Sequence, residues 1–228
     1  MDRAPLAFGR SLGGCHDASF SPILRAVDAR VAVLASGSGT NLQALLDDPA
    51  VGPAVALVVS DRSQAKALDR ARTAGVSAVH LDPVAHPSRE DHDRELLGQL
   101  RAASIDVVCL AGYMRILSPE LVRAYWGRMV NVHPSLLPAF PGAHAVREAL
   151  AWGARVTGCT VHLVDEELDH GPILAQEAVA ILADDDEETL HARIQEVEHR
   201  LYPATVRALL EGRVRIEGRR AAVEDRPG

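Results

Sequence analysis

Short apolar runs alternate with amphipathic stretches over most of this chain, beginning near residue 31. Apolar residues that recur every three or four positions predict helices, whereas short continuous apolar runs predict buried strands. The predicted strands are 31–35, 54–59, 78–81, 107–111, 156–164 and 173–181. The predicted helices are 41–46, 63–74, 89–103 and a long one that ends near Leu210. This alternation indicates an α/β domain with a central, mostly parallel sheet.

The two ends of the chain depart from this alternation. Residues 1–30 mix Gly, Ser, Pro and isolated apolar residues without a period, so we interpret them as a disordered extension or a misassigned start. The acidic group 184–188 suits the N-terminus of the long last helix. From residue 214 we expect a short strand or a loose end. The predicted organisation is an extension (1–30), one domain (31–217) and a tail (218–228).

Composition narrows the class of protein. A chain of 228 residues can bury a sizeable core without disulfides or metal. The net charge of -7 disfavours nucleic acid as a partner and favours a small-molecule substrate, although a local basic patch stays open. Cys15, Cys109 and Cys159 lack the spacing of metal ligands, and we interpret them as reduced. No secretory signal and no apolar run of about 20 residues is present, so we expect a cytoplasmic monomer or homodimer without membrane partners.

The segment Asn-Val-His-Pro-Ser-Leu-Leu-Pro, at 131–138, carries the first candidate chemistry. In a strand, Asn131 and His133 face the same side because they are two residues apart. An amide N–H can stabilise an oxyanion while an imidazole moves a proton, and acyl transfer to an amine needs both. The prolines then end the strand. By themselves, an Asn and a His at a strand end are more often loop caps or surface groups.

A second candidate is Asp169, in a turn between two β-rich segments. A carboxylate near His133 would favour the imidazolium form and raise the histidine pKa. The alternative for Asp169 is a turn residue that precedes Gly171 and Pro172.

The turn Ser-Gly-Ser-Gly-Thr-Asn, at 36–41, follows the first strand and opens a helix. Its backbone N–H groups and the helix dipole can face an anion, although many such turns use glycine only for packing. The turn is neither a dinucleotide fingerprint, because Leu42 replaces the third glycine, nor a Walker loop. A smaller phosphorylated metabolite is the remaining natural ligand.

Three stretches in this order resemble one family: SGSGTNLQALL, then AGYMRILSPELV, then NVHPSLLPAFPGAHAVREAL followed by GCTVHLVDEELDHGPI. They resemble the phosphoribosylglycinamide formyltransferases of purine biosynthesis over about residues 31–213. The resemblance implies a Rossmann-like, mostly parallel sheet of seven strands with helices on both faces. It also implies transfer of a formyl group from 10-formyltetrahydrofolate to the amine of glycinamide ribonucleotide, without a metal.

The resemblance also implies roles for individual residues. The catalytic set is Asn131, His133 and Asp169. The residues implied for glycinamide ribonucleotide are Gly39, Thr40, Asn41, Pro134, Gln195 and Glu198. Those implied for 10-formyltetrahydrofolate are Arg89, Met114, Arg115, Ile116, Leu117 and Asn131. His162 matches a histidine that lines the family site, and a structural histidine is an equal alternative.

The chain departs from better-known bacterial members of the family in the loop after the catalytic motif. Ala139 and Ala143 replace larger or charged residues, and Ala145 with Val146 replaces a more polar pair. We expect these changes to alter loop contacts or phosphate affinity and to leave the catalytic set intact. His144 is retained without an assigned role.

Three rival functions remain at this stage. Methionyl-tRNA formyltransferase shares the core motif, but it carries a C-terminal RNA-binding domain for which this acidic chain has no room. Formyltetrahydrofolate hydrolase carries an N-terminal regulatory domain that residues 1–30 are too short to supply, and it needs no phosphate loop. A noncatalytic domain that senses a phosphorylated metabolite would not need the catalytic trio.

Overall fold

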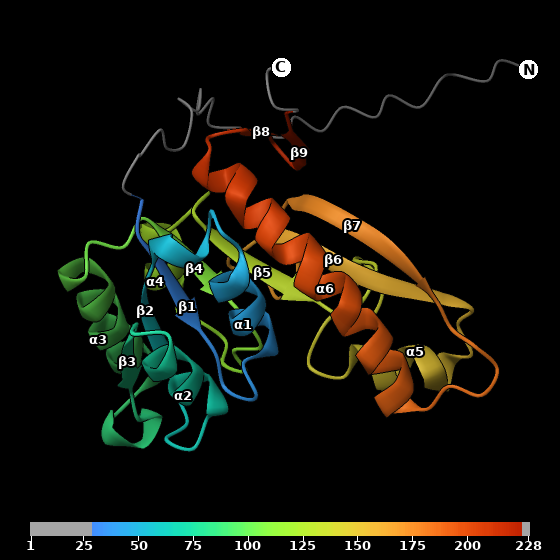
Figure 1. Ribbon diagram of the computed structural model, residues 1–228, viewed down its shortest axis with the longest axis horizontal. Coiled ribbons are helices and arrows are strands. Elements are labelled where there is room, and N and C mark those ends of the chain that lie inside the picture. Colours follow the sequence, from blue (N-terminus) through green and yellow to red (C-terminus); the bar gives the residue numbers. More distant parts are fainter. Residues whose placement is uncertain (1–28, 225–228) are drawn as a thin grey trace, which may run out of the picture.

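The computed structural model describes residues 29–224, so the predicted extension 1–30 lies outside the described residues except for Ala29 and Arg30. One sheet runs through the molecule, with its strands in the order β3-β2-β1-β4-β5-β6-β7-β9-β8 (Figure 1). The strands are β1 (Val31–Leu34), β2 (Val55–Ser60), β3 (Ser77–His80), β4 (Val107–Leu110), β5 (Met129–His133), β6 (Val156–Leu163), β7 (Ile173–Ala180), β8 (Val214–Glu217) and β9 (Arg220–Val223). The helices are α1 (Thr40–Asp47), α2 (Lys66–Thr73), α3 (Arg89–Ala102), α4 (Pro119–Ala124), α5 (Ala145–Trp152) and α6 (Glu187–Leu210).

The sheet is mixed. Strands β1 to β5 pair in parallel, whereas β6 is antiparallel to both β5 and β7. The α/β class and the mostly parallel sheet predicted from the sequence are confirmed. The prediction of seven strands is wrong, because the described residues form nine. The two additional strands, β8 and β9, form a hairpin around Gly218, whose φ of 60° suits a tight two-residue connection.

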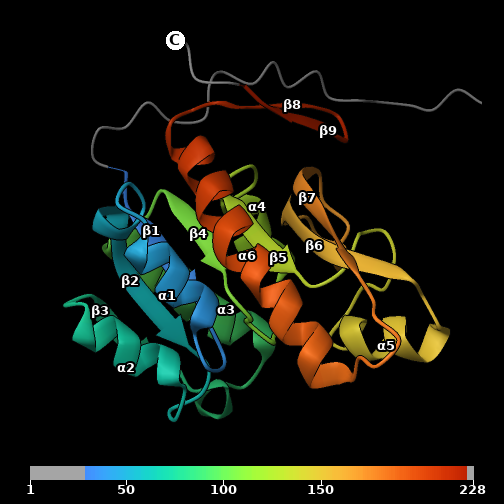
Figure 2. The same cartoon turned by 45° about the vertical axis from the view of Figure 1, so that its right-hand side comes forward.

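Helices cover both faces of the sheet, as predicted (Figure 2). Alternate residues of β1 serve two separate cores, since Val31 and Val33 belong to one and Ala32 and Leu34 to the other. The first core receives side chains from α1, α2 and α6, and the second from α3 and α4. Burial on both faces explains why the strands at the centre read as continuous apolar runs.

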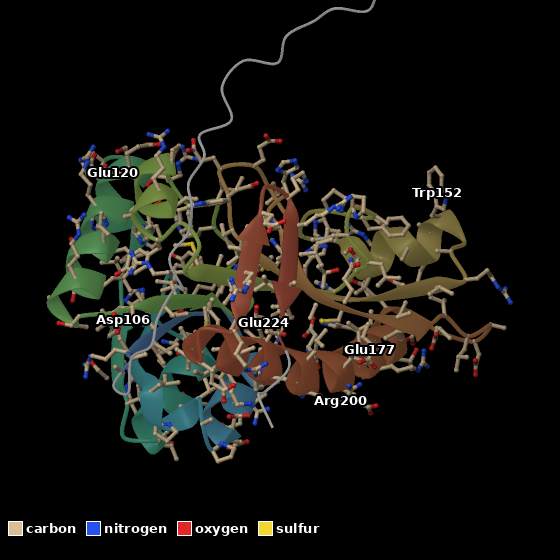
Figure 3. All side chains as sticks on the ribbon, turned by 90° about the horizontal axis from the view of Figure 1, so that it is seen from above. Asp106, Glu120, Trp152, Glu177, Arg200 and Glu224 are labelled. Carbon is tan, nitrogen blue, oxygen red and sulfur yellow. The ribbon has the colours of Figure 1, made fainter. Side chains whose placement is uncertain are left out.

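Helix α6 is capped at its N-terminus and bonded to the sheet further along. Asp186 caps its first turn in a capping box with Thr189. Further along, the buried Tyr202 hydroxyl donates to the Leu110 carbonyl at 2.9 Å and lies 3.2 Å from the Val130 carbonyl. On the outer side, Arg200 donates to Glu177 of β7 at 2.9 Å, and Figure 3 labels this pair between the helix and the strand. These contacts hold α6 against β4, β5 and β7.

The order of strands creates a natural site for ligands. Strand β1 lies between β2 and β4, so the segments that follow β1 and β4 leave the sheet in opposite directions. Open α/β sheets bind ligands in the crevice at such a point. Among residues 29–224, no helix has both the length and the apolar character needed to cross a membrane.

Candidate active site

The motif at the end of β5 places two polar side chains on one side of the sheet, as their spacing predicts. The Asn131 amide nitrogen lies 3.4 Å from one oxygen of the Asp169 carboxylate. The His133 Nδ1 atom lies 3.5 Å from the other oxygen. The structure therefore brings together the three residues that the resemblance makes catalytic.

Asp169 sits in the turn between β6 and β7 in a left-handed backbone conformation, with a φ of 50°. Its Oδ2 atom accepts a hydrogen bond from the Gly142 backbone N–H at 2.7 Å. The same carboxylate is shared by Asn131 and His133, and it is almost completely buried. The turn thus aims one negative charge at the end of β5.

The His133 ring is held from its other side as well. Its Nε2 atom lies 2.9 Å from the carbonyl oxygen of Phe140, in the loop that follows β5. Both ring nitrogens therefore face oxygen acceptors. The contact between Nδ1 and Asp169 is longer than an ordinary hydrogen bond, so this nitrogen can also turn toward a substrate atom.

His162 occupies the position opposite Asn131 in β6 and is only 2% exposed. Burial lowers the pKa of this imidazole, which favours its neutral form. Its Nδ1–H faces the Leu163 carbonyl at 2.8 Å, which leaves the Nε2 lone pair to accept from the Asn131 amide at 3.2 Å. His162 thereby fixes which end of the Asn131 amide points into the site.

The glycine-rich turn forms a cradle at the start of α1. Gly39 is the residue before the helix and has a φ of 69°. The Gly37 carbonyl accepts a hydrogen bond from the Ala67 backbone N–H at 3.2 Å, and Arg70 donates to the Ser38 carbonyl at 2.9 Å. The turn is therefore anchored on α2, with the N-terminus of α1 free to face an anion.

Replacing Gly39 with alanine is expected to destabilise the protein by roughly 2–5 kcal/mol. A residue with a Cβ atom pays about 1–2 kcal/mol in a left-handed conformation. The added carbon would also lie 2.8 Å from the Ala67 Cα atom, and overpacking of this kind costs about 1–3 kcal/mol. Urea unfolding measures the change.

Gly37→Ala is the matched control for Gly39→Ala, because a Cβ atom at position 37 meets nothing within 4 Å. Its free energy of unfolding should stay within about 1 kcal/mol of the wild-type value. Equal effects of the two substitutions would contradict the steric argument.

The last helix brings a distant carboxylate to the glycine-rich turn. Glu198 is only 4% exposed and accepts a hydrogen bond from the Asn41 side-chain amide at 2.8 Å. Gln195 lies three residues earlier on α6, so it shares that face of the helix. The residues implied for glycinamide ribonucleotide at Asn41 and Glu198 are in contact, although 157 positions separate them.

The segment implied for the folate follows β4. Met114 and Ile116 are largely exposed, whereas Leu117 is buried. The Met114 backbone N–H donates to the Ser36 hydroxyl at 2.9 Å. The Arg115 Nε atom is buried without a hydrogen-bond partner among the described residues. Exposed apolar side chains beside backbone groups suit a flat ring that would lie over this segment.

Arg89, the other residue implied for the folate outside β5, lies on a different element. It is the first residue of α3, and its guanidinium bonds Glu90 at 2.6 Å. Sequence reasoning also missed two partners of the catalytic set, namely the Phe140 carbonyl and the Gly142 N–H. Both are backbone groups, so no side-chain pattern could have revealed them.

The structure explains two of the four residues at which this loop departs from the better-known bacterial members of the family. Ala145 and Val146 begin α5 and are buried, so their apolar character serves packing. Ala139 and Ala143 are exposed, and nothing in the structure explains the loss of larger side chains there. His144 precedes α5 without capping it through its side chain.

The C-terminal hairpin reaches the turn that carries Asp169. Arg219, in the connection between β8 and β9, donates to the carbonyl of His170 at 2.6 Å. His170 also bonds Asp165 at 2.8 Å within the turn itself. The hairpin meets β7 at a single residue pair, Ile173 with Arg220.

Comparisons with known proteins agree with this geometry. The formyl transferase family model matches residues 29–206. The chain is 47% identical over 197 residues to the phosphoribosylglycinamide formyltransferase of Mycobacterium tuberculosis, covering 86% of this chain and 91% of the relative. The crystal structure of glycinamide ribonucleotide transformylase 1 from Symbiobacterium toebii superposes with a TM-score of 0.84 and 52% identity, covering 86% of this chain and 94% of that chain.

A third relative is much longer. The trifunctional purine biosynthetic protein adenosine-3 of Drosophila melanogaster is 48% identical over 188 residues, which are 80% of this chain and 14% of that protein. The chain thus matches one part of a multifunctional protein and nearly the full length of the bacterial relative. The chain belongs to the formyl transferase family, and within it to the phosphoribosylglycinamide formyltransferases.

Proposed function

We propose that this chain transfers the formyl group of 10-formyltetrahydrofolate to the primary amine of glycinamide ribonucleotide, in de novo purine biosynthesis in the cytoplasm. The products are formylglycinamide ribonucleotide and tetrahydrofolate. One observation carries the proposal: Asn131 and His133 share the Asp169 carboxylate at 3.4 and 3.5 Å. The trio lies in the domain that we assign to residues 31–217, with 218–228 as a tail.

Attack of the amine on the formyl carbon produces a tetrahedral oxyanion, which needs hydrogen-bond donors. The Asn131 amide has two N–H donors. His162 holds the amide at 3.2 Å, and the approach to Asp169 at 3.4 Å is long enough to be exchanged for a substrate oxygen. We assign Asn131 to the oxyanion.

His133 supplies a second donor in the proposed mechanism. Its two ring nitrogens face the Phe140 carbonyl and the Asp169 carboxylate, an arrangement that suits an imidazolium with two N–H groups. The bond to Phe140 fixes the ring plane. Because the contact to Asp169 is longer than an ordinary hydrogen bond, Nδ1 can donate instead to an oxyanion bound beside the fixed ring.

Asp169 moves the proton. The attacking amine must lose a proton and the departing folate nitrogen must gain one, either directly or through a water molecule. The carboxylate supports the imidazolium by its charge and can accept the amine proton. The hydrogen bond from Gly142 keeps one carboxylate oxygen in place during these steps.

The two substrates are held from opposite directions. The phosphate of the nucleotide is assigned to Gly39, Thr40 and Asn41 at the N-terminus of α1. Glu198 and Gln195 of α6, with Pro134, take the remainder of the nucleotide. The folate is assigned to residues 114–117 and to Arg89. Holding both partners in line converts a collision in solution into a reaction within one complex.

The test is the absorbance change as the purified protein converts 10-formyltetrahydrofolate, measured with and without glycinamide ribonucleotide. We expect turnover only when the nucleotide is present. Formyl loss without the nucleotide would identify a hydrolase instead. Tight binding of either ligand without turnover would favour a metabolite sensor.

A further inference from the structure

Ser36 connects the two ligand segments of the proposed site. It is the second residue after β1, is only 2% exposed and is the first residue of the glycine-rich turn. Its backbone N–H donates to the Gly112 carbonyl at 3.1 Å, and its hydroxyl oxygen accepts from the Met114 N–H at 2.9 Å. One residue of the first loop thus holds two residues of the segment that follows β4.

The glycine-rich turn is anchored on its other side as well. Through the Gly37 and Ser38 carbonyls it bonds Ala67 and Arg70 of α2. Gly39 approaches Ala67 so closely that it leaves no room for a Cβ atom. The turn is therefore short and bonded at both sides. A movement of its phosphate-binding residues would consequently be transmitted to Ser36.

We propose that Ser36 is a positioning residue that couples the phosphate loop to the folate segment, so that binding of one substrate strengthens binding of the other. The proposal rests on the proposed function above. Occupation of the turn by a phosphate would fix Ser36, and the Ser36 hydroxyl would in turn fix the Met114 backbone. By linkage the effect is reciprocal, so the folate strengthens nucleotide binding by the same factor.

The variant Ser36→Ala removes the bond to Met114 and keeps the backbone bond to Gly112. Loss of one net hydrogen bond corresponds to roughly a 2- to 12-fold change in an equilibrium constant. We expect tetrahydrofolate alone to bind more weakly by about this factor. We expect glycinamide ribonucleotide alone to bind as it does to the wild type. The ratio of tetrahydrofolate dissociation constants without and with the nucleotide should fall toward one.

Calorimetric titration of the full chain under anaerobic conditions measures these constants for each ligand alone and with the other at saturation. Thr157→Val is the matched control, because it removes a buried hydroxyl that has no hydrogen-bond partner among the described residues. This control should leave every constant unchanged. A Ser36→Ala protein with unchanged constants, or with equal losses for both ligands, would overturn the coupling.

Amide hydrogen exchange tests the coupling without any substitution. Glycinamide ribonucleotide alone should slow the exchange of the Met114 amide in the wild-type protein, although Met114 is not among the residues proposed to contact the nucleotide. If the exchange rate of the Met114 amide does not change when the nucleotide binds, the inference is refuted and the proposed function is left intact. A wild-type protein that binds neither ligand would instead refute the proposed function.

Discussion

Asp169→Asn is expected to reduce kcat by roughly 10²- to 10⁴-fold, the contribution of a well-placed proton-transfer group. The substitution removes the negative charge that Asn131 and His133 share and leaves the volume of the side chain nearly unchanged. Asparagine also tolerates the left-handed backbone of this position, where φ is 50°. The loss should therefore appear in the chemical step, measured as kcat for nucleotide-dependent formyl transfer.

The control for Asp169→Asn is the neighbouring carboxylate Glu167, which is exposed and lies in the same turn. Glu167→Gln should retain the wild-type kcat, because its exposed side chain lies 3.9 Å from the His170 ring and makes no hydrogen bond to the trio. Circular dichroism and urea unfolding of Asp169→Asn should match the wild type. A variant that folds normally and turns over at the wild-type rate would remove Asp169 from the mechanism.

Asn131→Ala is expected to reduce kcat by roughly 10²- to 10³-fold, as loss of an oxyanion donor does in other acyl transfers. The KM values should change much less, because the donor acts mainly on charge that develops in the transition state. Steady-state kinetics with each substrate varied in turn separates the two effects. A variant that raises both KM values at an unchanged kcat would place Asn131 in binding alone.

The position of Asn131 depends on His162, which offers a control of a different kind. His162→Gln keeps a hydrogen-bonding side chain opposite Asn131, so its effect on kcat should be smaller than that of Asn131→Ala. If the two variants lost activity equally, orientation of the amide would account for the whole role of Asn131.

The strands of the central sheet could be predicted closely because they are buried on both faces and therefore carry uninterrupted apolar runs. The apolar run 107–111 forms β4 (Val107–Leu110). The helix predicted at 89–103 is observed as α3 (Arg89–Ala102). Helices α4 and α5 were missed. They have six and eight residues, too few for a clear period, and tertiary contacts rather than periodicity define them.

The catalytic trio could be proposed from local chemistry because an amide and an imidazole two residues apart are visible in a strand. The contact between Asn41 and Glu198 could not be derived in that way, since it depends on how α6 crosses the sheet. Without the resemblance, Glu198 would have been interpreted as a solvated helix residue. The hairpin at the edge of the sheet was predicted only as a short strand or a loose end from residue 214, because a four-residue strand at an edge is hard to distinguish from a loose end.

Through the hairpin of β8 and β9, residues late in the chain contact the turn that carries Asp169. Arg219 bonds the residue next to Asp169, yet it lies beyond residue 206, where the match to the family model ends. Sequence change outside the region matched by the family model can therefore adjust the turn that carries Asp169, without any change in the motif at 131–138. For the laboratory, a purification tag belongs away from this end of the chain.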